Sequence, residues 1–216
     1  MSDAATPRWF LRSPTPDEIG AFIGAQAGQA FSYDAVGATR DDTLRAVRGF
    51  DFDCNRVRLG EGEAVFERAC AALRAWRMFP VPWTRIAPAG AAIREGQVLA
   101  MQAQALGLWW DNACRIVYVL DENMGGVRRF GFAYGTLPAH VESGEERFSV
   151  ELHTDGTVWY DLRAFSRPRY WPVRIAKPVA RALQRRFVRE SQAAMRVAAA
   201  MGASDEKFET RGGAPR

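Results

Sequence analysis

The pattern of hydrophobic and polar residues changes from a helical period to a period of two near residue 98. Before that point, Thr15-Pro16-Asp17-Glu18 matches a capping box with proline at the first helical position, which predicts that a helix begins there. Apolar residues then recur at helical spacing between Glu63 and Arg77, which predicts a second helix. We expect a short strand at 31–36 and irregular structure at 40–58.

Alternating apolar and polar residues beyond this point predict a run of antiparallel strands. Thr154-Asp155-Gly156 joins two alternating segments and is a strong hairpin signal, and Asn123–Gly126 indicates an earlier turn. The predicted strands are 98–106, 113–120, 128–135, 146–153 and 157–165. Strands followed by a separate helix are typical of an α+β fold.

The last predicted element is a long helix at 176–201. Its apolar stripe comprises Val179, Leu183, Phe187, Ala194, Ala198 and Met201. Four arginines lie largely off this stripe and are expected to face solvent: Arg181, Arg185, Arg189 and Arg196. Residues 202–216 are small and polar, which predicts a disordered tail. We therefore expect a single domain over 1–201, with residues 1–14 extended.

The composition is that of an ordinary soluble globular protein, with 48% hydrophobic and 25% charged residues among 216. No apolar run approaches the roughly 20 residues needed to cross a bilayer, and the first residues lack a signal-peptide core, so we expect a cytoplasmic protein. Cys54, Cys70 and Cys114 are widely spaced without a CxxC pair, which predicts buried thiols rather than disulfides or a zinc ribbon. We expect neither metal nor cofactor.

Positive charge is concentrated between Asp161 and Arg196. This segment has a net charge of +8, whereas the whole chain has +4. In 163–174, arginines alternate with aromatic residues, a pattern that could serve single-stranded nucleic acid. We favour a solvated surface, because arginine makes up nearly all the basic residues of the chain, and expect no nucleic-acid partner.

Strand connectivity brings polar residues to one edge of the predicted sheet. This edge collects the start of strand 113–120, the loop 136–145 and the exit of the last strand, and the final helix begins beside it. The candidate rim residues are Arg115, Tyr134, Thr136, His140, Glu142, Glu145, Glu146, Arg147, Ser166 and Arg167. Its arginines could bind a carboxylate or phosphate through paired hydrogen bonds. Alternatively, the glutamates and arginines pair with one another and hold the loop in place.

Known catalytic patterns are missing from the chain. His140 and His153 are the only histidines, and there is no HExxH, GxSxG or glycine-rich nucleotide loop. His140-Val141-Glu142 matches the HxE of zinc deaminases, but the downstream PCxxC is absent. If the protein is an enzyme, then His140, Glu142 or Tyr134 are the candidates for acid or base.

Several segments resemble one family of domains of unknown function, whose pattern runs approximately YGTLPGHxExGEExF, then a tryptophan-bearing strand, then AFSRP. The matching residues are Tyr134–Pro138, His140, Glu142, Gly144–Phe148 and Ser166–Pro168. The resemblance spans roughly 33–189, and its main departure is Ala139, where the family usually has glycine. Its element order is similar to the START-like, pollen-allergen-like helix-grip (SRPBCC) superfamily, which implies a curved antiparallel sheet wrapped around a long C-terminal helix, with an apolar cavity between them.

This resemblance implies that a small hydrophobic or amphipathic, lipid-like molecule binds between sheet and helix. The expected cavity residues are Phe130, Phe132, Tyr160, Leu162, Leu183 and Phe187. These aromatics could equally fill a solid core. Two other functions stay open: a cyclase, hydratase or isomerase that uses the same cavity, and an interaction module that uses the basic face of the last helix.

Overall fold

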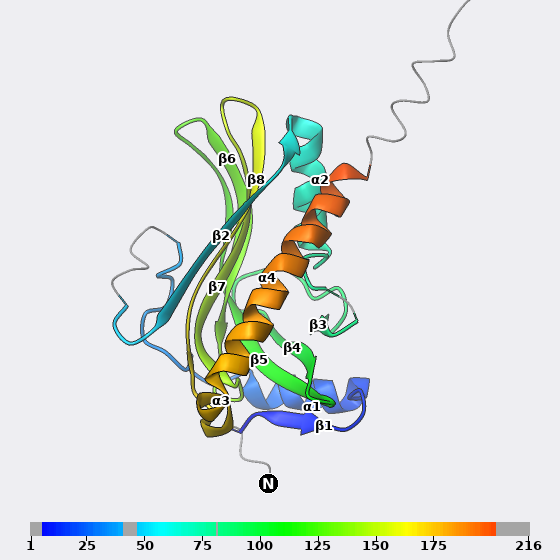
Figure 1. Ribbon diagram of the computed structural model, residues 1–216, viewed down its shortest axis with the longest axis vertical. Helices are drawn as coiled ribbons and strands as arrows, with labels where there is room; N and C mark the ends of the chain where they lie inside the picture. Colours follow the sequence, from blue (N-terminus) through cyan, green and yellow to red (C-terminus); the bar gives the residue numbers. More distant parts are fainter. Residues whose placement is uncertain (1–5, 41–46, 81, 202–216) are drawn as a thin grey trace, which may run out of the picture.

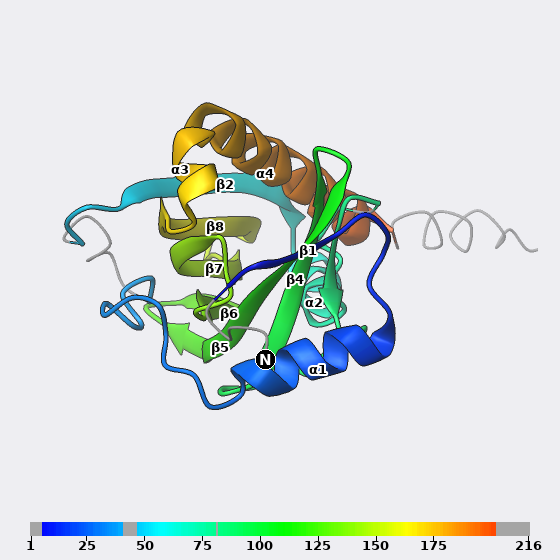
Figure 2. The ribbon, with the colours of Figure 1, turned by 90° about the horizontal axis from the view of Figure 1, so that it is seen from below.

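A single curved antiparallel sheet forms the frame of the computed structural model, which describes residues 6–40, 47–80 and 82–201 (Figure 1). The strands are β1 (Arg8–Phe10), β2 (Asp51–Glu61), β3 (Thr84–Ala87), β4 (Val98–Ala105), β5 (Leu108–Met124), β6 (Val127–Thr136), β7 (Glu142–Leu152) and β8 (Thr157–Pro168). Their order is β2-β8-β7-β6-β5-β4-β3, and β1 pairs with β5. Seen from below, the sheet curves from β2 round to β4, and α4 lies across its open side (Figure 2).

Four helices accompany the sheet: α1 (Pro16–Gln26), α2 (Glu63–Arg74), α3 (Trp171–Ile175) and α4 (Lys177–Ala200). The predicted capping box of α1 is confirmed, because the Glu18 amide donates to the Thr15 hydroxyl and the Thr15 amide donates to the Glu18 carboxylate. The long final helix is also confirmed. It lies on the concave side of the sheet, beside α2 at its C-terminal end (Figure 1).

The main core lies between the concave face of β6, β7 and β8, helix α2, and the C-terminal half of α4. The alternation predicted for β6 and β8 is confirmed, because their inward residues all belong to this core: Phe130, Phe132, Tyr134, Val158, Tyr160 and Leu162. The predicted fold class is therefore confirmed. The chain is an α+β protein with a curved antiparallel sheet around a long C-terminal helix, the helix-grip arrangement.

Two predicted segments were wrong. Residues 31–36 form bends rather than a strand, and they lie against the sheet at Glu145. Strand β2 occupies part of the segment 40–58, which was expected to be irregular. β2 pairs on one side only, with β8, and most of its residues are half-buried or exposed, so no clean alternation marks it.

The apolar stripe predicted for α4 is displaced from the face that the helix buries. Val179 and Met201 are exposed, whereas Ser191 and Met195 are fully buried and Gln184 is half-buried. The buried face of α4 therefore includes polar residues, and a stripe defined by hydrophobic residues alone leaves them out.

Some predictions concern residues that the structure does not describe. The tail 202–216 and the first five residues lie outside the described ranges, and the prediction of one domain stays a prediction. In the described part of the chain, none of the helices has the length and apolar character to cross a membrane. Cys70 and Cys114 are buried free thiols, as predicted. Cys54 is also a free thiol but is exposed on the edge strand β2, so the prediction that it is buried was wrong.

Candidate functional site

A cavity of about 600 Å³ lies between the N-terminal half of α4 and the concave face of the sheet. Most of its wall is apolar, and its members include Phe79, Trp83, Met101, Leu162, Leu183 and Phe187. The exposed residues of its lining mark the mouth: Leu106 in the turn after β4, and Val179, Arg185 and Arg189 on α4. This space is a candidate site for a small molecule.

The two halves of α4 differ in how they meet the rest of the protein. In the C-terminal half, Ser191, Met195 and Ala199 are fully buried, and this half packs on α2. Small side chains at Ala198 and Ala199 allow the two helices to approach closely. In the N-terminal half, Ala180, Leu183 and Phe187 stay half-buried beside the cavity, and Arg181 and Gln184 reach the sheet through hydrogen bonds.

Two carboxylates from β7 face the polar end of the cavity. Glu142 and Glu146 are four residues apart on one strand, so their side chains point to the same face. The Tyr134 hydroxyl donates to Glu146 at 2.6 Å, and the Gln184 amide donates to Glu142 at 2.7 Å. Burial raises the pKa of Glu146 to about 7 and also raises the pKa of Glu142.

An ion pair connects the edge strand β2 to α4 beside these carboxylates. Arg181 donates to both oxygens of Asp53, at 2.6 and 2.8 Å, and also to the side-chain oxygen of Gln184 at 2.8 Å. Both members of the pair line the cavity. The prediction that Arg181 faces solvent was therefore wrong, because Asp53 holds its guanidinium against the sheet.

His140 lies on the cavity wall as a neutral group. Its Nδ1 accepts the backbone N–H of Glu142 at 2.9 Å, so its proton is on Nε2. Burial lowers the pKa of His140 to about 3. An imidazole of this kind stays uncharged at neutral pH and is a weak base. His140 also lines a smaller pocket next to Arg169 and Trp171.

Three further residues predicted for the rim contact the cavity or its polar groups. Tyr134 and Thr136 line the wall, and the Thr136 hydroxyl also accepts the Gly144 amide at 2.9 Å. Ser166 lies on the wall 3.4 Å from the amide nitrogen of Gln184.

The three arginines predicted for the rim lie elsewhere. Arg147 is buried on the convex face, where it pairs with Asp161 at 3.0 Å and donates to the Thr39 carbonyl. Arg115 donates to the carbonyl oxygens at the end of α1, and the guanidinium carbon of Arg167 lies 4.4 Å from the ring centre of Phe50. None of these arginines lines the cavity, so the polar end contains carboxylates where the sequence suggested cationic groups.

Glu145 also points away from the cavity. Its carboxylate accepts hydrogen bonds from the Tyr33 hydroxyl, from the amides of Gly37 and Thr39, and from the Thr39 hydroxyl. Gly135 makes this possible, because a side chain there would collide with the Tyr33 hydroxyl. Glu145 thus holds the segment 33–39 on the convex face.

The six hydrophobic residues expected in the cavity divide into two groups. Leu162, Leu183 and Phe187 line it. Phe130, Phe132 and Tyr160 belong to the filled core. The hydroxyl groups of Tyr160 and Ser191 form a hydrogen bond of 2.9 Å there. The sheet and α4 therefore enclose both a solid core and a cavity, at different ends of the helix.

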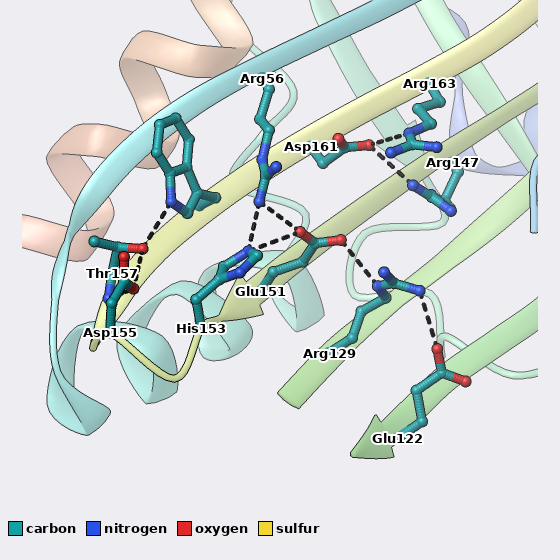
Figure 3. Close-up of polar contacts among 11 residues, drawn as sticks. Arg56, Glu122, Arg129, Arg147, Glu151, His153, Asp155, Thr157, Asp161 and Arg163 are labelled. Atoms are coloured by element: carbon teal, nitrogen blue, oxygen red, sulfur yellow. Dashed lines mark hydrogen bonds and ion pairs between the residues drawn. The ribbon is translucent and has the colours of Figure 1, made fainter. Parts of the chain in front are cut away.

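The convex face carries a separate network of ion pairs (Figure 3). Glu151 accepts from Arg56 at 2.7 Å and from Arg129 at 2.9 Å, and Asp161 accepts from Arg147 and Arg163. These pairs link strands of the sheet. His153 contacts Glu151 at the end of β7, whereas His140 lies before the start of that strand. Within the described ranges, no three histidine, cysteine or carboxylate side chains gather where they could hold a metal ion.

Sequence reasoning missed several polar residues of the cavity wall, among them Asp53 and Gln184. Asp53 lies in the strand that was expected to be irregular. Gln184 follows Leu183 on the helix, one turn beyond Ala180, so a helical wheel centred on Ala180 and Ser191 would have placed it on the inner face.

A cavity held between a curved antiparallel sheet and a C-terminal helix defines this chain as a helix-grip protein, and sequence comparison gives its family. Residues 32–194 match the model of the family described as Domain of unknown function (DUF1990), and the chain belongs to that family. A UPF0548 protein of Deinococcus radiodurans is 39% identical over 197 residues, which cover 84% of this chain and 93% of that protein. A UPF0548 protein of Dictyostelium discoideum is 32% identical over 196 residues, or 84% of this chain and 91% of that one.

One of the similar solved structures is that of Ara h 8.0201. It aligns with 71% of this chain and 100% of its own, at 11% identity and a TM-score of 0.43. The fold assignment rests on the sheet order and on the position of α4.

Proposed function

We propose that this protein binds a small hydrophobic or amphipathic molecule in the cavity between the sheet and the N-terminal half of α4. The observation that carries the proposal is the cavity itself, about 600 Å³ with a largely apolar wall and a few polar groups at one end. Binding sites for small molecules commonly have this size and this lining. We also propose that the protein works in the cytoplasm.

The half-buried state of the wall supports this proposal. Leu183, Phe187 and Met101 keep accessible surface that points into the cavity. Covering such surface releases roughly 25 cal/mol for each Å² of apolar area that leaves water. An apolar molecule would gain this free energy on entering and would stabilise the fold by binding the native state alone.

A matched pair of tryptophan variants on α4 tests the proposal. Ala180 is half-buried and lines the cavity, whereas Ala182 is exposed on the same turn. Ala180→Trp should fill the cavity and lower the affinity for the neutral apolar dye N-phenyl-1-naphthylamine about tenfold or more, because its side chain occupies the binding volume. Ala182→Trp should leave the affinity unchanged. Equal dye binding by wild type and both variants would refute the proposal.

Glu146 favours a second candidate function, an isomerase, hydratase or cyclase acting in the same cavity. A carboxyl group whose pKa is about 7 is balanced between acid and base at neutral pH, and Tyr134 holds it in position. Glu146 suits this role better than His140, whose pKa is about 3, or Tyr134, whose pKa is raised well above its usual value by burial. For any molecule found to be converted, Glu146→Gln should abolish turnover, whereas Glu67→Gln on α2 should not.

A further inference from the structure

The two carboxylates at the polar end of the cavity are paired with neutral groups. Glu146 accepts from the Tyr134 hydroxyl and Glu142 accepts from the Gln184 amide. The nearby guanidinium of Arg181 is held by both oxygens of Asp53, so its positive charge is already balanced. Glu142 and Glu146 therefore bring negative charge into an apolar space, and no cationic side chain forms an ion pair with either of them in the part of the chain that the structure describes.

The other charged and titratable groups around the polar end of the cavity do not neutralise Glu142 or Glu146. His140 is neutral, and Lys177 pairs with Asp51 at 2.9 Å. Arg185 and Arg189 border the mouth, but they are exposed, so water and salt screen their effect on the interior.

This charge distribution discriminates between head groups. A carboxylate or phosphate placed beside Glu142 and Glu146 would meet like charges in a site that is shielded from water, which is strongly unfavourable. A protonated amine would supply the missing positive charge and donate charge-assisted hydrogen bonds to the carboxylate oxygens.

We propose that the cavity selects an amphipathic amine, whose cationic nitrogen pairs with Glu146, with Glu142 further along the same strand, while its apolar part lies along Leu183 and Phe187. This inference rests on the proposed function and adds the chemical class of the ligand. It replaces the anionic head group that the sequence suggested, because Arg115, Arg147 and Arg167 do not line the cavity. The Tyr134 hydroxyl then keeps Glu146 oriented toward the nitrogen.

Three probes that share one alkyl chain test the inference: decylamine, decan-1-ol and decanoate. Each is titrated into the whole protein at pH 8 by calorimetry, below its critical micelle concentration. We expect decylamine to bind about tenfold more tightly than decan-1-ol, because a hydrogen bond to a charged partner is stronger than one between neutral groups. Decanoate should bind most weakly of the three.

Substitutions and a change of pH test whether the preference for decylamine depends on Glu142 and Glu146. Glu146→Gln should remove most of the advantage of decylamine over decan-1-ol and Glu142→Gln a smaller part of it, whereas Glu67→Gln, on α2, should keep it. Lowering the pH from 8 to 5.5 should weaken decylamine binding about tenfold, because Glu146 takes up a proton near pH 7 while the amine stays charged. Thermal melts confirm that each variant is folded, and the pH series tests the inference with wild type alone.

The outcomes separate the two proposals. If decan-1-ol or decanoate binds as tightly as decylamine, or if decylamine binds equally well at pH 5.5 and pH 8, then the amine inference is wrong and the binding proposal stands. If no probe binds, both proposals are refuted.

Discussion

Two adjacent glutamates of β7 lie in opposite environments. Glu145 points to the convex face, where it is buried and accepts hydrogen bonds from four donors of the segment 33–39. Glu146 points to the concave face, where one hydroxyl donates to it and the rest of its surroundings belong to the cavity. The protein therefore satisfies the hydrogen-bonding capacity of the Glu145 carboxylate and leaves that of the Glu146 carboxylate largely unused. This difference separates a group that holds the fold together from one that is available to a ligand.

Helix α4 shows the same contrast with apolar residues. Met195 is fully enclosed between α2 and the sheet, whereas Leu183 is half-buried and borders the cavity. One helix therefore serves the core with its second half and the candidate site with its first half. Stability and ligand binding should accordingly respond to different substitutions.

The largest expected effect is on the convex face. Glu145→Ala should lower the free energy of unfolding by about 3 kcal/mol, because it leaves several buried donors without an acceptor. Glu146→Ala should cost far less, since only Tyr134 loses its partner. Urea denaturation at pH 7 measures both. Equal losses would mean that the two carboxylates do not have separate roles.

The next effect compares the two halves of α4. Met195→Ala should cost about 3 kcal/mol, because it leaves a cavity in a packed core. Leu183→Ala should cost less than about 1 kcal/mol, because the side chain already borders open space. The same denaturation experiment tests both variants, and a loss at Leu183 as large as that at Met195 would show that the N-terminal half is packed too.

The smallest effect concerns the pH dependence of stability. The folded-state pKa of Glu146 is about 7 against an ordinary value of 4.5, so ionising this group costs more in the folded than in the unfolded state. Its contribution to stability is fully present below pH 4.5 and is lost as the pH rises through 7. Glu146→Gln should therefore be more stable than wild type by about 1–2 kcal/mol at pH 8 and should lose this advantage near pH 4.

Denaturation of wild type and Glu146→Gln across this range gives the measurement. Glu67→Gln is the control, and its difference from wild type should not change with pH in the same way. An advantage of Glu146→Gln that is equal at both ends of the range would show that the carboxyl group is not held in an apolar setting.

Much of the fold could be predicted from local patterns. Alternation identified β4 to β8, the Asp155-Gly156 turn placed a hairpin, and the capping box placed the start of α1. These signals succeed because each depends on neighbouring residues only. Strand β2 was not predicted, because most of its residues are half-buried or exposed and no alternation of apolar and polar residues marks it.

The candidate site was harder to predict. Strand connectivity placed the rim residues at one edge of the sheet. It could not show which face of the sheet each side chain occupies, because β7 begins earlier in the sequence than predicted. Strand β7 begins at Glu142, and its alternation directs Glu142 and Glu146 inward and Glu145 and Arg147 outward. Whether Phe132 and Leu162 border filled or empty space depends on where α4 parts from the sheet, which no local pattern records.

Native mass spectrometry of the purified protein tests the central claim most directly, since a cavity ligand should survive as a mass on the intact chain. We expect wild type and Ala182→Trp to carry a small molecule, or to take up one equivalent of decylamine when it is added, and Ala180→Trp to do neither. A wild-type chain that stays bare and takes up no decylamine, or an Ala180→Trp variant that binds as wild type does, would contradict the account.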